Sequence, residues 1–306
     1  MRRLLRWAVE QFVSFAARFA PNAFMSKSAI TDLFERRAPH PQNAIDVFSG
    51  EWSSKFPKSV DVEAGDTELF NDPRMLWLEE QIGGFGGKRI LELGPLEGAH
   101  TATLERLGAA EIVAVEANTR AYLKCLITKE ILGLKRVRFL LGDALSFLNE
   151  IDDRFDVIIA SGVFYHMEDP VALLAAMSER TDLLFLWTHY WDSDRAARDI
   201  DFAGRFLRTD EVESLGLPHR LHRHEYKRTF VWRGFPGGVG LSSSWMEKEE
   251  ILRALEHVGF RHHVLGVDAP SHPNGPCFGV LAKRTEGDAN QGPGGLVCSS
   301  NGSPLP

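Results

Sequence analysis

The chain has 306 residues, of which 44% are hydrophobic and 10% aromatic, so it can form a sizeable core. Its 35 basic and 42 acidic residues leave a net charge of −7, whereas proteins that bind duplex DNA or long RNA usually carry a basic surface. Three cysteines without metal-ligand spacing favour a reducing compartment. We therefore expect a globular cytoplasmic protein without a metal, and nucleic acid is disfavoured as a partner.

Residues 1–65 are predicted to form a helical extension and a flap. Apolar side chains recur every three or four positions over residues 1–20, as in an amphipathic helix, and no stretch of about 18 apolar residues could span a membrane. The apolar face predicts packing on the domain or a homodimer contact, with a membrane surface as the alternative. Trp52, in a polar loop, is interpreted either as a hydrophobic plug or as a flap over a ligand.

The segment KRILELGPLEGAH at 88–100 predicts a buried strand, a glycine turn and the start of a helix. Gly94 and Gly98 bracket the turn, where the missing Cβ atoms let the backbone approach a ligand. The next strand, at 112–115, stops at Glu116, whose carboxylate can accept both hydroxyls of a ribose. This order of elements predicts half of a nucleotide-binding site.

The turn also indicates which nucleotides are disfavoured. Leu96 stands where a dinucleotide-binding turn has its second glycine, and no loop of the type that binds triphosphates is present. The remaining ligand is a nucleoside without phosphates whose polar end is cationic. Glu92 and Glu97 are expected to favour such a cation electrostatically.

Strands and helices alternate along the rest of the chain, which predicts a doubly wound α/β fold with a mostly parallel sheet. The helix at 119–132 is expected to turn Leu123, Leu126, Ile127 and Ile131 to this sheet. Ser244 and Glu247 resemble a capping box that opens a helix at 245–257. An antiparallel pair at the sheet edge follows, and residues 286–306 read as a disordered tail.

The insertion at 192–243 interrupts the alternation and is predicted to be a lid over the acceptor. His222, His224, Tyr226 and Arg228 alternate within it, which indicates either the solvated face of a hairpin or the inner face of this lid. These histidines lack the helical spacing of a zinc site. Arg228 is expected to contact an acidic or phosphorylated acceptor through paired hydrogen bonds.

Polar side chains also follow the fourth and fifth predicted strands. Tyr165 and His166 come after the fourth strand, and His189, Tyr190 and Trp191 come at the end of the fifth. Ligands of such sheets bind at the carboxyl ends of the strands, so both groups are expected near the reaction centre. An imidazole that titrates near neutrality there can remove a proton from a hydroxyl acceptor.

Over residues 66–285 the chain resembles the class I S-adenosylmethionine-dependent methyltransferases. The resemblance is carried by Glu92-Leu93-Gly94, by Glu116, by Gly142-Asp143-Ala144 and by FDVIIASGVFYHMEDP at 155–170. It implies a Rossmann-like methyltransferase domain at 66–285 that binds S-adenosyl-L-methionine. The implied cofactor-binding residues are Glu92, Gly94, Gly98, Glu116, Ala117, Asp143, Ala144 and Ser161.

The expected reaction is O- or N-methylation of a small-molecule acceptor. The predicted catalytic residues are His166, His189 and Tyr165, and the predicted acceptor contacts are Trp52, Tyr190, Trp191, Tyr226 and Arg228. SGVFYHMEDPVALL, with the upstream Glu51-Trp52-Ser53-Ser54, also resembles the tRNA wobble-uridine carboxymethyltransferases. An RNA-acting alkyl transferase is therefore one alternative, and a non-catalytic cofactor-binding module is another.

Overall fold

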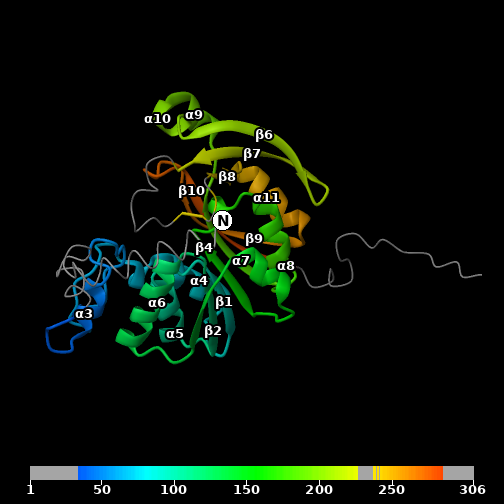
Figure 1. Ribbon diagram of the computed structural model, residues 1–306. Coiled ribbons are helices and arrows are strands. Elements are labelled where there is room, and N and C mark those ends of the chain that lie inside the picture. The colour runs from blue at the N-terminus through cyan, green and yellow to red at the C-terminus, as the bar shows by residue number, and fades with distance from the viewer. Residues whose placement is uncertain (1–33, 227–236, 239, 241, 285–306) are drawn as a thin grey trace, which may run out of the picture.

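The computed structural model describes residues 34–226, 237–238, 240 and 242–284. Its centre is a seven-stranded sheet in the order β3-β2-β1-β4-β5-β10-β9 (Figure 1). The first five strands are parallel, whereas β10 runs antiparallel to both β5 and β9. The predicted doubly wound fold with an antiparallel edge is confirmed. The strands are β1 (Arg89–Leu93), β2 (Glu111–Glu116), β3 (Val137–Leu141), β4 (Val157–Ser161), β5 (Leu183–His189), β9 (Phe260–Ala269) and β10 (Cys277–Arg284).

Helices cover both faces of this sheet, and each layer encloses its own apolar cluster (Figure 1). On one face the helices are α4 (Pro73–Ile82), α5 (Ala99–Arg106) and α6 (Thr119–Leu132). On the other face they are α7 (Ala144–Glu150), α8 (Pro170–Ser178) and α11 (Lys248–His257). No helix in the described part of the chain has both the length and the apolar character that a membrane crossing requires.

The predicted inward face of helix α6 is only partly confirmed. Ile127 and Ile131 pack against the core, whereas Leu123 and Leu126 are exposed. The buried positions include Lys124 and Cys125 instead. The prediction failed at Leu123 and Leu126 because a lysine occupies the inward face, where only a specific polar partner makes burial acceptable.

The N-terminal segment packs against α6 through one short helix, α3 (Pro41–Asp46). Trp52 is buried against Phe48 and Phe56, and its indole N–H donates to the carbonyl of Ile45 at 2.9 Å. Of its two interpretations, the structure supports the hydrophobic plug. The predicted helix at 1–20 lies outside the described residues.

A second, three-stranded antiparallel sheet stands over the carboxyl edge of the main sheet (Figure 1). It consists of β6 (Phe206–Ser214), β7 (Leu217–Glu225) and β8 (Ser242–Trp245), and the short helices α9 (Ser193–Arg198) and α10 (Ile200–Ala203) precede it. Its histidines are not solvated: His219 and His222 are buried, and His222 stacks on Trp191. The solvated-face interpretation was therefore wrong.

The predicted capping box at Ser244 was also wrong. Ser244 and Trp245 belong to β8, and α11 begins only at Lys248. Glu247 is its N-cap residue but makes no side-chain capping bond.

Candidate active site

A cavity of about 1050 Å³ opens at the carboxyl ends of β1, β2, β4 and β5, as expected for a sheet of this kind. This volume lies at the upper end of the range for small-molecule sites, which leaves room for a cofactor together with an acceptor. The cavity is lined by nine of the predicted site residues: Gly94, Glu116, Ala117, Asp143, Ala144, Ser161, Tyr165, His166 and His189.

The turn after β1 places backbone atoms directly against the cavity. Gly94 has φ +64°, and a Cβ at this position would lie 2.6 Å from a methyl carbon of Val163, so only glycine fits. Leu96 also adopts a left-handed conformation, with φ 55°. Its backbone N–H donates to Glu116 Oε2 at 3.0 Å, which fixes the turn against the end of β2.

Glu116 is oriented by backbone donors and points into the cavity. Its Oε1 accepts the N–H of Asn118 at 2.8 Å, and the backbone N–H of Ala117 also acts on this carboxylate. Burial raises the pKa of this carboxyl, although the surrounding backbone N–H groups oppose the rise. An acceptor pair of this kind suits two vicinal hydroxyls.

Two further groups fit a nucleoside. The hydroxyl oxygen of Ser161, at the end of β4, is buried in the cavity wall and has no hydrogen-bond partner among the described residues. A buried hydroxyl without a partner is costly unless a ligand supplies one. Asp143 caps α7 by accepting the Ser146 N–H at 2.8 Å, and it also lines the cavity. The residues present therefore fit the predicted cofactor.

Glu92 and Gly98 lie behind the cavity wall and do not line it. Glu92 is fully buried, accepts the hydroxyl of Thr101 at 2.5 Å, and has a pKa raised by burial. Gly98, at φ +78°, precedes α5 and touches the ring of Phe139. The resemblance implies that Glu92 and Gly98 contact the cofactor directly. The structure places both residues behind the cavity wall, where they support the turn.

Glu97 has a different role from the one that its charge suggested. Its carboxylate accepts the backbone N–H groups of Ser53 and Ser54, at 2.9 and 2.7 Å, and forms a buried ion pair with Lys124 at 2.5 Å. It therefore points away from the cavity. It ties the N-terminal segment to the cofactor turn.

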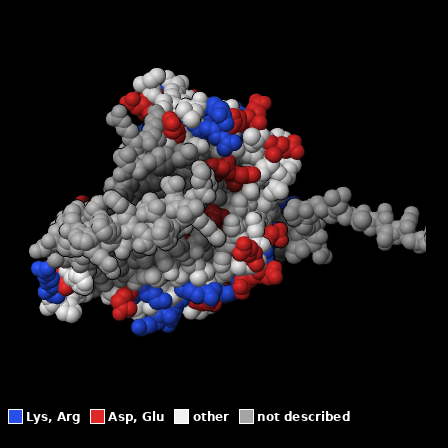
Figure 2. Space-filling view, viewed as in Figure 1, with Lys and Arg blue, Asp and Glu red and all other residues white. Residues whose placement is uncertain are grey.

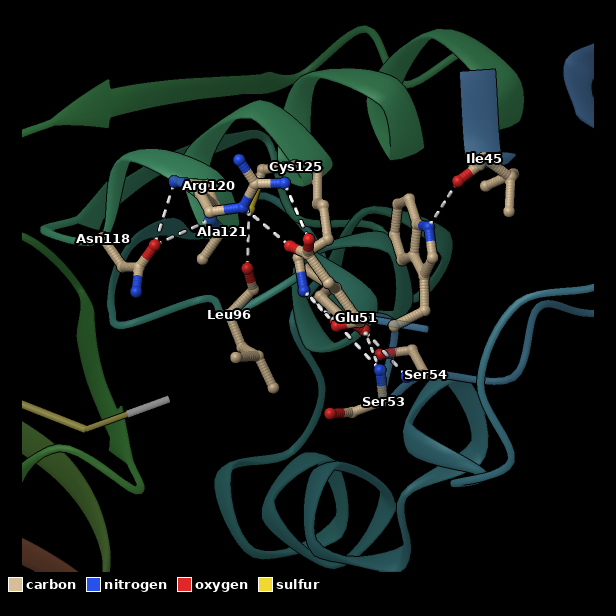
Figure 3. A network of polar contacts seen from close by, with 12 residues as sticks. Ile45, Glu51, Ser53, Ser54, Leu96, Asn118, Arg120, Ala121 and Cys125 are labelled. Atoms are coloured by element: carbon tan, nitrogen blue, oxygen red, sulfur yellow. Dashed lines mark hydrogen bonds and ion pairs between the residues drawn. The ribbon is translucent and has the colours of Figure 1, made fainter. Parts of the chain in front are cut away.

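Helix α6 completes this network (Figure 3). The Lys124 ammonium also donates to the carbonyl of Glu51 at 2.7 Å, and the Glu51 carboxylate pairs with Arg120 at 2.7 and 2.8 Å. Cys125 donates to the carbonyl of Leu96 at 3.5 Å. The turn, α6 and the segment at 51–54 thus form one connected unit.

The sequence did not single out three polar residues at the start of α4 and α5. Asp72 accepts from His100 at 2.9 Å and pairs with Arg74, and all three line the cavity. Burial pushes the pKa of Asp72 upward, but the hydrogen bonds from His100 and Arg74 outweigh it, and the net shift is downward. Asp72 directly before Pro73 is a recognisable helix-start signal that could have drawn attention to it.

The three predicted catalytic residues lie together, and we call their part of the cavity the acceptor half. The Tyr165 ring centroid is 4.1 Å from that of His166 and 4.7 Å from that of His189. Burial lowers the pKa of His166 to about 3 and that of His189 to about 4, so both imidazoles are neutral near pH 7. His166 Nδ1 lies 2.7 Å from the Tyr226 hydroxyl oxygen.

The predicted acceptor contacts are mostly absent from the cavity wall. None of Trp52, Tyr190 and Trp191 lines the cavity. Tyr190 packs against Phe278, and Trp191 packs against Phe202 of α10 and His222 of β7. Tyr226 does not line the cavity, but its hydroxyl contacts two lining residues, His166 and Gly238. Arg228 lies outside the described residues. His272, Asn274 and Cys277 line the acceptor half instead, and no sequence motif marked them.

Residues 85–221 match a family model described as a methyltransferase domain. Over 111 residues the chain is 27% identical to a tRNA U34 carboxymethyltransferase of Campylobacter hominis; the match covers 35% of this chain and 38% of that protein. The chain thus matches well under half the length of this relative.

Among solved structures, the fold is similar to the N-terminal domain of EvdMO1. One structure of this domain, with SAH bound, has a TM-score of 0.61 at 22% identity, and another, in the presence of SAH and D-fucose, has a TM-score of 0.60 at the same identity. Each comparison covers 80% of this chain and 95% of that domain. Over residues 85–221 the chain thus matches a methyltransferase domain, and its fold is that of a domain whose structure has SAH bound.

Proposed function

We propose that the protein transfers a methyl group from S-adenosylmethionine to a hydroxyl group of a neutral small molecule. The observation that carries this proposal is the single cavity that contains both the ribose-type acid Glu116 and the imidazoles of His166 and His189. When bound, the cofactor supplies an electrophilic methyl group on a sulfonium. The protein's own residues then bind, orient and deprotonate.

In the cofactor half, we propose that Glu116 accepts the ribose hydroxyls and Asp143 lies near the adenine. Gly94, Ala117 and Ala144 line this half with backbone and small side chains, and Ser161 offers its unpartnered hydroxyl. Glu92 and Gly98 hold the turn in place from behind. A displacement reaction in line with the leaving sulfur depends mainly on such positioning.

In the acceptor half, we propose that a neutral imidazole takes the acceptor's proton as its oxygen attacks. The low pKa values of His166 and His189 keep both rings unprotonated, which is the form that a general base requires. Burial raises the pKa of Tyr165, so its phenol stays protonated and can donate a hydrogen bond to the acceptor.

The charge of the cavity supports a neutral acceptor. Its described lining contains one guanidinium, Arg74, which is already paired with Asp72. The acidic lining residues are Glu68, Asp72, Glu116, Asp143, Glu168 and Asp169. This excess of carboxylates suits the sulfonium of the cofactor and repels a phosphate-bearing acceptor.

The charge distribution on the surface also supports a small-molecule acceptor. On the face shown in Figure 2, acidic and basic side chains are interspersed over the described residues. Binding of an RNA would be favoured by a basic stripe that leads to the site. The partial match to a tRNA-modifying enzyme keeps RNA as the acceptor that the experiment must exclude.

The test is methyl transfer from labelled S-adenosylmethionine into an extract separated into small molecules, lipid and RNA. We expect label in the small-molecule fraction, in an uncharged product stable to mild base, as a methyl ether is. Label in RNA would overturn the proposed acceptor. Failure of S-adenosylhomocysteine to bind in calorimetry would overturn the proposed function as a whole.

A further inference from the structure

Three side chains with metal-ligating atoms converge in the acceptor half. His189 comes from the end of β5, Cys277 from the start of β10, and His272 from the connection between β9 and β10. One ligand atom of each lies within 4.8 Å of the others, and all three side chains line the cavity. We propose that His189, His272 and Cys277 bind one zinc ion, with an open coordination position that faces the acceptor.

The sheet and the backbone hold two of these ligands in place. His189 and Cys277 are direct partners in the antiparallel ladder between β5 and β10. His189 Nδ1 lies 2.9 Å from the carbonyl oxygen of Gly275 and 3.2 Å from that of Pro276, so the proton resides on Nδ1 and Nε2 keeps its lone pair. Metal-bound histidines usually donate their other ring N–H to a carbonyl or carboxylate in this way.

His272, the third ligand, needs only a small movement of its side chain to complete the site. Tetrahedral zinc, with bonds of about 2.1 Å to nitrogen and about 2.3 Å to sulfur, holds its ligand atoms roughly 3.5 Å apart. The ligand atoms lie at most 4.8 Å apart, so they must approach one another by no more than about 1.3 Å. His272 stands outside both strands, and its Nδ1 accepts only a long bond, 3.2 Å, from the N–H of Asn274. Exchanging this bond for a metal bond leaves the ladder intact.

The ligand types select zinc over the common hard cations. Two imidazoles and a thiolate contain no oxygen ligand, whereas magnesium and calcium require oxygen. Three protein ligands with a fourth position open are typical of catalytic zinc. Binding releases the Cys277 thiol proton, and the ion reaches the site through the cavity. The carboxylates of the lining favour the approach of a cation.

The role of the ion rests on the proposed methyl transfer to a hydroxyl. A hydroxyl bound at the open position loses its proton more readily, and the neutral imidazole of His166 takes that proton. The oxygen forms its bond to the methyl carbon while the bond from this carbon to the sulfonium sulfur breaks. The electron pair of that bond stays on sulfur, which leaves S-adenosylhomocysteine. His189 then acts as a ligand, and His166 as the base.

Cobalt(II) is a spectroscopic probe of this site, because a cysteine thiolate bound to cobalt gives a near-ultraviolet charge-transfer band. We would treat the full-length protein with a chelator and titrate it with cobalt alone. We expect a band that saturates at one equivalent and disappears when zinc is added. The same band should be lost in Cys277→Ser, and cobalt affinity should fall at least tenfold in His272→Gln.

The matched control uses Cys125, which lies on α6 and outside the cluster. Cys125→Ser should keep the full charge-transfer band. The proposal is overturned if no band forms, or if the band survives in Cys277→Ser. Calorimetry with S-adenosylhomocysteine tests the zinc site and the proposed function separately. If cofactor binding and methyl transfer both persist after chelation, only the zinc site is refuted. Loss of cofactor binding in every form would refute the transferase itself.

Discussion

The Lys124 ammonium lies 2.5 Å from the Glu97 carboxylate, and the two side chains are 3% and 0% exposed. Lys124 comes from α6 and Glu97 from the turn after β1, so this pair joins the two elements behind the cofactor turn. The backbone N–H groups of Ser53 and Ser54 share the same carboxylate. The N-terminal segment and the cofactor turn therefore depend on one buried ion pair.

Removing one partner of this pair should destabilise the protein strongly. Lys124→Met leaves the Glu97 charge buried without a cation, and we expect the free energy of unfolding to fall by about 3 to 5 kcal/mol in urea titrations. The double variant Glu97→Gln/Lys124→Met should recover part of this loss, because no charge then remains. The exposed pair of Arg154 and Asp182 is the control, and Arg154→Met should change stability by less than about 1 kcal/mol. Equal losses in the single and double variants would contradict a coupled pair.

Lys124 also explains why part of the site was beyond sequence analysis. The strand, turn and acid from β1 to Glu116 were predictable, because local apolar runs and glycines determine them. A lysine inside α6 has no local signature, since only its distant partner Glu97 makes its burial favourable. No local sequence pattern marks His189 and Cys277 as neighbours either. They are 88 positions apart in the sequence, and only the register of the β5 and β10 ladder brings them together.

The second sheet shows a related limit. Alternation correctly predicted that β7 is extended, yet it could not show that the face with His222 is covered, whereas Pro218 and Arg220 are exposed. His222 stacks on Trp191 at a centroid distance of 4.4 Å, so histidine behaves here as an aromatic packing residue. Because Trp191 stacks on His222, it does not line the acceptor half, where the sequence analysis had predicted it.

Glu116 should dominate cofactor affinity among the cavity acids. Glu116→Ala removes charge-assisted hydrogen bonds of about 1.5 to 3 kcal/mol, so the dissociation constant for S-adenosylhomocysteine should rise roughly tenfold to a hundredfold. Calorimetry provides the measurement. Glu111→Ala, at the far end of the same strand, should keep wild-type affinity, because Glu111 pairs with Arg89 away from the cavity. An unchanged constant in Glu116→Ala would remove Glu116 from the cofactor site.

Glu92 should make the stability of the protein depend on pH. Burial raises its pKa in the folded state, so the folded form is favoured while the carboxyl is protonated. This contribution is complete below the ordinary glutamate pKa, and it is lost as the pH rises through the raised value. Glu92→Gln cannot ionise. Its melting temperature should therefore match that of the wild type near pH 4 and exceed it at pH 7 to 8. Melting curves that differ by the same amount at every pH would show that Glu92 does not titrate in this range.

His166 should control the rate of transfer without affecting cofactor affinity. Its ring lines the cavity beside Tyr165, and its neutral form can take the proton of the acceptor. His166→Gln should lower the single-turnover rate by about 10² to 10⁴, with an unchanged dissociation constant for S-adenosylhomocysteine. Tyr226→Phe removes only the hydroxyl that lies 2.7 Å from His166 Nδ1, so it should lower the rate less and leave half-saturation by the acceptor unchanged. His257→Gln, at an exposed histidine on α11, is the control and should keep the wild-type rate. If His166→Gln also keeps that rate, no proton passes through His166, and positioning alone must account for the catalysis assigned to it.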